Sequence, residues 1–145
     1  MICLLFFKVY SEWKEDNIVH KQKENKERII KNFEENKNIF DILVKNIYSR
    51  EEEIQIVFSD KNIKFIADGK EEELDNEYYN LLNRIYKILK CERIRLHKDS
   101  SENKILQIYL IDEGVYSDSI IFGKDKEESM DEFSPGWYYK TLWST

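Results

Sequence analysis

The chain has 145 residues, of which 41% are hydrophobic and 36% are charged, and its formal net charge is −6. A chain of this length buries roughly 70% of its unfolded surface as a single domain, and this apolar content excludes an intrinsically disordered chain. The negative charge repels nucleic-acid phosphates, and two cysteines, Cys3 and Cys91, are too few for a disulfide framework.

The N-terminus carries six consecutive apolar residues, Ile2 to Phe7, followed by Lys8. This run is much shorter than the roughly 20 residues that cross a bilayer, and it lacks the basic start and cleavage site of a secretory signal. Three interpretations remain open: a buried first segment, the end of an anchor that begins upstream, or a weak contact with a membrane surface. We therefore assign residues 1–10 to a short apolar segment and residues 11–145 to a single α+β domain.

Residues 13–48 contain neither glycine nor proline and predict helix. Residues 14–28 are polar nearly all round, so we expect them to be solvent-exposed and partly frayed. Asn36 and Asn38 interrupt the apolar stripe that follows, and asparagine favours helix ends, so we expect a bend or a break near residues 35–37. The stripe has spacings of three and four and consists of Ile29, Ile30, Phe33, Phe40, Leu43, Val44 and Ile47.

Two short strands are predicted next, at residues 54–59 and 62–67, because apolar residues alternate there and a tight turn separates them. Residues 74–90 predict the second helix, which has an apolar stripe on one side. Its acidic start and basic end complement the helix dipole.

Four strands are predicted after this helix, at residues 92–97, 104–111, 119–122 and 137–143. Short loops favour antiparallel neighbours, so these strands form a meander. We therefore predict an α+β fold with an N-terminal helix or helix pair, a β-hairpin, a second helix, and a four-stranded antiparallel meander packed on the helices.

This order of elements resembles the nuclear-transport-factor-2-like fold. A second resemblance is carried by the Lys/Asn-rich first helix, with Glu34-Glu35-Asn36-Lys37 before Ile39-Phe40, and by Gly136-Trp137-Tyr138-Tyr139 near the end. In these segments the chain resembles small uncharacterised proteins of low-GC Gram-positive bacteria. An N-terminal hydrophobic anchor often precedes the domain in that group, which implies that residues 1–7 are the end of an anchor. The resemblance implies no activity.

Motifs for catalysis, metals and cofactors are missing from the sequence. The four glycines are isolated, which excludes a glycine-rich phosphate loop. The two histidines, His20 and His97, have no serine or cysteine at a spacing that suggests a nucleophile and its base, and no Cys–His cluster has zinc spacing. The acidic loop lacks the alternating ligands and central glycine of an EF-hand. We predict no enzymatic activity, no metal and no cofactor.

Residues 112–132 hold eight acidic residues and two lysines, which accounts for the whole net charge. This field attracts a basic partner, and the alternative is a solvated loop that only keeps the protein soluble. The last strand is rich in aromatic residues, which form either core packing or an exposed interaction surface. The candidate partner-binding residues are Asp125, Glu127, Glu128, Asp131, Trp137, Tyr139 and Trp143.

These features predict a cytoplasmic, non-catalytic binding protein of the immunity type, which neutralises a basic protein partner such as a toxin. We expect no nucleic-acid partner, because the basic stripe on residues 92–97 has no interleaved aromatic residues and consists of Arg93, Arg95 and His97. One alternative is a small-molecule or lipid pocket, with or without enzymatic activity, lined by Tyr109, Phe122 and Tyr139. The other is a membrane-tethered extracytoplasmic domain whose anchor precedes Met1.

Overall fold

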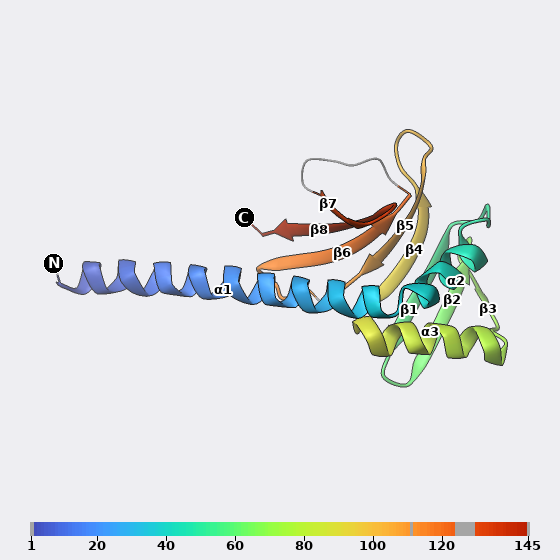
Figure 1. Cartoon of the computed structure of the whole chain (residues 1–145), viewed down its shortest axis with the longest axis horizontal. Helices are drawn as coiled ribbons and strands as arrows, with labels where there is room; N and C mark the ends of the chain where they lie inside the picture. The colour runs from blue at the N-terminus through green and yellow to red at the C-terminus, as the bar shows by residue number, and fades with distance from the viewer. Residues whose placement is uncertain (1, 111, 124–129, 145) are drawn as a thin grey trace.

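The computed structural model describes residues 2–110, 112–123 and 130–144, and it shows an α+β fold. The described residues form three helices and one antiparallel sheet of eight strands (Figure 1). The helices pack on one face of this open, curved sheet and bury most of the core there (Figure 1).

The first two helices meet at Asn36, which confirms the predicted break. Helix α1 spans Ile2–Glu35 and helix α2 spans Lys37–Ile47. Asn36 leaves the helical conformation at φ −122°, and its side-chain amide donates to the backbone oxygen of Asn32 at 2.9 Å. The break lets both helices place apolar side chains on the sheet, since Phe33 of α1 stacks on Phe40 of α2 with 4.3 Å between ring centroids.

The N-terminal half of α1 extends beyond the rest of the molecule, as the blue part of the ribbon shows (Figure 1). Its large apolar side chains face solvent; Phe6 is 76% exposed and Trp13 is 59% exposed. The interpretation of a buried first segment is therefore wrong for the residues whose side chains are described. The boundary drawn after residue 10 falls inside this continuous helix.

The part of α1 that was expected to fray, residues 14–28, is helical throughout and contacts the sheet with one side. Gln22 is buried and donates to the hydroxyl of Thr141 at 3.0 Å, and Asn25 donates to the hydroxyl of Tyr116 at 2.9 Å. A polar stripe on a helix therefore packs here against polar groups of a strand, which hydrophobic periodicity does not detect.

The sheet has the strand order β3-β2-β1-β4-β5-β6-β8-β7, with antiparallel pairing throughout. The strands are β1 Ile54–Ser59, β2 Asn62–Ala67, β3 Lys70–Glu72, β4 Arg93–Lys98, β5 Lys104–Tyr109, β6 Tyr116–Phe122, β7 Met130–Ser134 and β8 Trp137–Trp143.

The predicted four-stranded meander is therefore not a sheet of its own. Its strands β4, β5, β6 and β8 are the centre of a larger sheet, which the hairpin β1–β2 extends on one side. The edge strands β3 and β7 were missed, because β3 is a three-residue, fully exposed strand and β7 has no alternation of apolar and polar residues. Strands this short and polar form only because a neighbouring strand supplies the hydrogen bonds.

Helix α3 spans Asn76–Leu89 and packs beside α1 and α2 (Figure 1). The side chain of Asp75 caps its N-terminus by accepting from the backbone N–H of Tyr78 at 2.7 Å. The helix ends at Lys90, which has a left-handed backbone with φ 54°. The predicted start at residue 74 is two residues early, because the capping aspartate precedes the first helical residue.

Candidate functional site

The aromatic last strand lies with one side in the core. Trp137 and Tyr139 are each about 1% exposed and contact the helices, so they are core residues and the prediction that they form a binding surface is wrong. The rings of Phe33 and Trp137 pack edge to face, with 4.8 Å between their centroids. Trp143 lies four residues after Tyr139 on the same strand, is 46% exposed and remains available to a partner.

The predicted acidic residues are only partly described. Asp125, Glu127 and Glu128 lie outside the described residues. Asp131 on β7 is exposed and accepts from the Lys26 ammonium group of α1 at 2.6 Å. This aspartate therefore holds α1 against the edge of the sheet.

The end of β8 and the loop before β6 form an exposed apolar surface with an acidic border. Ser144 donates its backbone N–H to the backbone oxygen of Val115 at 2.7 Å, which places the two segments side by side. The ring of Trp143 lies 5.2 Å from the ring of Tyr116. Other residues of this surface, which we call the acidic tip, add one exposed apolar group and two carboxylates: the tip consists of Asp112, Glu113, Val115 and Trp143.

A cleft of about 380 Å³ lies beside the acidic tip, between α1, the C-terminal end of α3 and the start of β6. The last turn of α3 lies against α1 at this point (Figure 1). The lining mixes polar and apolar groups. Helix α1 contributes Asn25, Arg28, Ile29 and Asn32, the end of α3 contributes Lys87, Ile88, Leu89 and Lys90, and the sheet side contributes Leu110, Glu113, Tyr116 and Asp118.

Asp118 is the buried charged group of this cleft. The hydroxyl of Tyr139 donates to Oδ2 of Asp118, and both side chains are almost fully buried. Burial and this hydrogen bond raise the pKa of the Tyr139 phenol well above its ordinary value, so the phenol is protonated at physiological pH and can act as the donor. Within the described residues, Oδ1 of Asp118 has no hydrogen-bond partner.

Sequence reasoning missed this pair. Asp118 lies in a strand among serines and isoleucines, and the only available signal was a carboxylate at a position that alternation assigns to the core side of β6.

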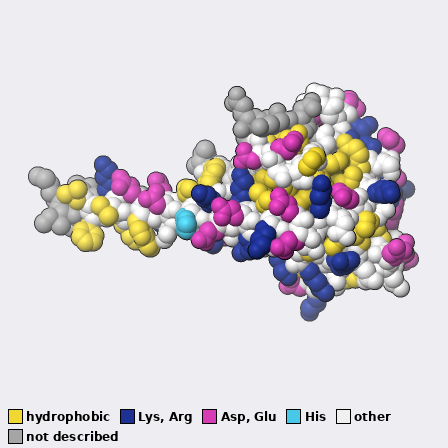
Figure 2. Space-filling model, viewed as in Figure 1, with side chains coloured by type: hydrophobic (Ala, Val, Ile, Leu, Met, Phe, Trp, Pro, Cys, Tyr) yellow, Lys and Arg dark blue, Asp and Glu magenta, His cyan; other side chains and the backbone are white. Residues whose placement is uncertain are grey.

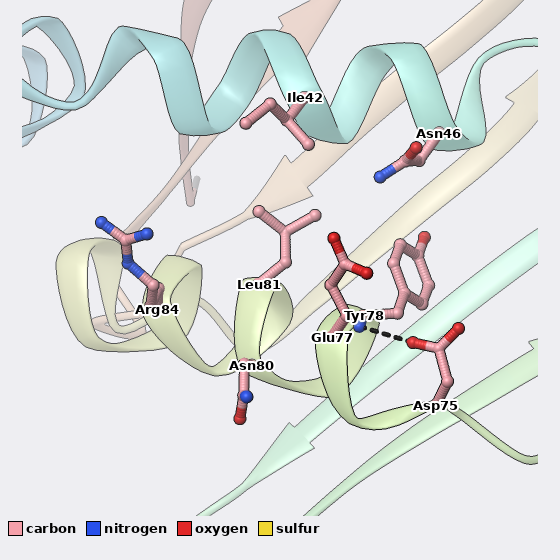
Figure 3. Close-up of a pocket in the computed structure, with 8 residues that line it drawn as sticks. All are labelled: Ile42, Asn46, Asp75, Glu77, Tyr78, Asn80, Leu81 and Arg84. Carbon is pink, nitrogen blue, oxygen red and sulfur yellow. Dashed lines mark hydrogen bonds between the residues drawn. The ribbon is translucent and has the colours of Figure 1, made fainter.

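A second hollow, of about 500 Å³, lies between α2 and α3 (Figure 3). Ile42 and Leu81 face each other across it, and Asp75 points back to the N-terminus of α3 as the helix cap (Figure 3). Burial raises the pKa of the Tyr78 phenol to about 12, so this group is neutral at physiological pH. The hollow is a groove between two packed helices, and the carboxylate of Asp75 in its lining serves as the helix cap.

The pocket predicted from Tyr109, Phe122 and Tyr139 does not form. Tyr139 pairs with Ile120 and Ile120 with Ile108, so Tyr109 is one residue out of step and faces the opposite side of the sheet. There the guanidinium of Arg93 lies 4.1 Å from the Tyr109 ring centroid.

The basic stripe of β4 lies on this open face of the sheet, as predicted. Arg95 donates to Glu53 at 3.0 Å. Burial lowers the pKa of the guanidinium, but the interactions with Glu53 and Tyr109 together outweigh it and raise the pKa. His97 lies 3.4 Å from the side-chain oxygen of Gln107. Both contacts are typical of structural polar pairs on a sheet.

The described residues contain no group of three or more His, Cys, Asp or Glu side chains arranged to hold a metal ion. His20 is exposed on α1 and lies 3.0 Å from Glu24. Cys91 is a buried free thiol.

Comparisons with protein-family models, with curated proteins and with solved structures find no match to this chain. Within the part of the chain that the structure describes, no helix is both long and apolar enough to cross a membrane.

Proposed function

We propose that this chain is a cytoplasmic, non-catalytic binding protein of the immunity type, which captures a basic protein partner at the acidic tip. The observation that carries this proposal is the exposure of Trp143 and Val115 beside the loop that carries the carboxylates of Asp112 and Glu113. These four residues come from two segments that backbone hydrogen bonds hold together.

The chemistry of the tip suits a basic partner. A large aromatic side chain surrounded by smaller apolar groups is the usual centre of a protein interface, and a polar border excludes water from it. The carboxylates would speed the encounter with a positively charged surface and reject a negative one. Lys21 of α1 lies 3.4 Å from Glu113, which fixes that carboxylate at the border of the apolar group.

The test is affinity capture from the native cell with the wild-type chain and two matched variants. Trp143→Ala removes the apolar centre of the tip, and Tyr79→Ala removes an exposed aromatic residue on α3, far from the tip along the chain. We expect the wild type and Tyr79→Ala to retain the same basic protein and Trp143→Ala to bind it at least tenfold more weakly, about 1.4 kcal/mol.

The contribution of the acidic tip's negative charge to binding is tested with the captured protein as the binding partner. Reversing Asp112 and Glu113 to lysine should lower the association rate constant measured by surface plasmon resonance, with a smaller effect at high salt. A captured protein that is acidic, or one that Trp143→Ala retains unchanged, would overturn the proposal.

A second candidate function is a membrane-tethered domain, and a separate observation favours it. The projecting half of α1 presents Leu5, Phe6, Val9, Tyr10 and Trp13 to solvent, each more than half exposed (Figure 2). A soluble helix normally hides such a series of residues.

A further inference from the structure

We propose that about the first three turns of α1 enter a lipid surface at an angle, with the sheet and the acidic tip held on the solvent side. Given the membrane-tethered candidate function, on which this inference rests, the structure assigns which side of the helix meets the lipid and which end lies deeper. The acidic tip is then free to capture a protein while the chain is held at the surface.

The exposed apolar side chains of the projecting half lie on one side of α1. Leu5, Val9 and Trp13 follow one another at intervals of four residues, so they lie one above the other, and Phe6 and Tyr10 lie next to them. We call these five residues the α1 stripe. Each is at least 59% exposed, so the part of the chain that the structure describes leaves the stripe uncovered.

The α1 stripe faces away from the sheet. Helix α1 is continuous from Ile2 to Glu35. Gln22 follows Trp13 by nine residues, which is about two and a half helical turns, so the two side chains lie on opposite sides of α1. Gln22 is buried and donates to Thr141 of β8 at 3.0 Å. A continuous helix therefore cannot turn the stripe onto its own sheet, and the occupant of the stripe comes from outside the chain.

The order of side chains along α1 matches a lipid interface. Leu5 and Phe6 lie nearest the N-terminus, Tyr10 and Trp13 follow, and residues 14–16 are charged. Aliphatic and phenyl groups suit the hydrocarbon, tyrosine and tryptophan prefer the headgroup boundary, and charged groups remain in water. A coiled-coil partner needs several heptads of apolar positions, whereas the stripe covers only residues 5–13. Lipid is therefore the occupant that fits.

The shape of the molecule sets the angle of entry. Helix α3 packs against α1 and lies on the other side of α1 from β6 and β8 (Figure 1). This bulk prevents α1 from lying flat on a surface along its whole length, so only the projecting turns reach the lipid. Leu5 and Phe6 then lie deepest, and Trp13 lies at the boundary.

The acidic tip stays in water in this orientation. Asn25 of α1 donates to the hydroxyl of Tyr116 at 2.9 Å, and the ring of Tyr116 lies beside Trp143. The tip is thus on the sheet side of α1, away from the stripe. Trp13 and Trp143 report on the two sides by their fluorescence, and the third tryptophan, Trp137, is buried in the core.

The experiment measures tryptophan fluorescence of the full chain on neutral phosphatidylcholine vesicles with and without brominated acyl chains, which quench tryptophans at the hydrocarbon. Readings are normalised to the protein that co-sediments with the vesicles. Trp143→Phe, which keeps Trp13, should lose roughly a third of its emission. Trp13→Phe, which keeps Trp143, should lose no more than about a tenth.

A second pair of variants tests the side of the helix. In the Trp13→Phe background, Phe6→Trp places the probe in the stripe, and Lys8→Trp places it a little over half a turn further round, at an exposed position. We expect quenching of Phe6→Trp to be at least about twice that of Lys8→Trp, because an interfacial helix buries one face.

The outcomes separate the inference from the candidate function. No co-sedimentation of the wild type with the vesicles would reject the membrane-tethered candidate and the orientation together. Co-sedimentation with strong quenching of Trp143, or with equal quenching at positions 6 and 8, would reject the orientation alone and leave the tethered candidate in place.

Discussion

Cys91 shows at the scale of one residue how burial changes chemistry. The thiol is 1% exposed between α3 and β4, and burial raises its pKa to about 12 from an ordinary value of 9.0. Nucleophilic attack requires the thiolate, so the folded protein holds this cysteine in an unreactive form. The size of the pKa change depends on the packing around the thiol, which the sequence does not show.

We predict that Cys91 reacts with a thiol reagent only after unfolding. The measurement is the rate of labelling by DTNB in a Cys3→Ser variant, with and without denaturant. Because the unfolded thiol ionises near pH 9 and the folded one near pH 12, the free energy of unfolding should also fall as the pH rises above 9. Labelling at neutral pH as fast as that of a free cysteine would contradict this prediction.

Sequence reasoning about single residues could not predict that three side chains of the sheet are buried: Trp137, Tyr139 and Asp118. Alternation placed Trp137 and Tyr139 on one face of a strand, but the choice between core and surface depended on where α1 lies. Phe33 of α1 covers Trp137, and this contact joins residues more than 100 positions apart. The buried carboxylate of Asp118 has the same origin, since its donor Tyr139 belongs to another strand.

Helix α1 is the element whose two halves have different surroundings. The C-terminal half is held to the sheet by Gln22, Asn25 and Lys26, whereas the N-terminal half extends into solvent (Figure 1). Leu5, Phe6 and Val9 are exposed there, and charged residues 14–16 follow Tyr10 and Trp13. A second copy of the chain could cover only one side over less than two heptads, so a lipid surface fits this half better.

We predict that α1 binds lipid vesicles through this half. Changing Leu5, Phe6 and Val9 together to glutamine should reduce co-sedimentation with vesicles at least tenfold, because each large apolar side chain contributes about 1.5–3 kcal/mol when buried. Val19→Gln, at an exposed apolar position nearer the body, is the control. Residues 8–16 carry more acids than lysines, so neutral and anionic vesicles should bind alike. No binding by the wild type to either vesicle would contradict the prediction.

The aromatic cluster around Phe33 joins the whole molecule. Phe33 is fully buried and contacts Phe40 of α2, Phe133 of β7 and Trp137 of β8 at ring-centroid distances of 4.3–5.0 Å. One side chain thus connects both N-terminal helices to the C-terminal edge of the sheet. Aromatic rings bury large apolar areas and prefer such edge and stacked contacts.

We predict that Phe33→Ala lowers the free energy of unfolding by about 3–5 kcal/mol, because it leaves a cavity where four elements meet. Urea denaturation followed by circular dichroism measures this change. Tyr79→Ala, on the exposed side of α3, should change it by no more than about 1 kcal/mol. Equal effects of the two substitutions would show that the cluster does not hold the elements together.

The sequence alone determined the local elements of this protein. Periodicity and capping residues located the helices from residue 13 onward, the break at Asn36, the β1–β2 hairpin and the four central strands, because these depend on residues near one another in the chain. Only the tertiary structure decided the edge strands, the projection of α1, the burial of Trp137 and Tyr139, and the cleft at Asp118. Each of these depends on contacts between distant segments, and the physical reason is that a side chain's surroundings are set by whichever element packs over it.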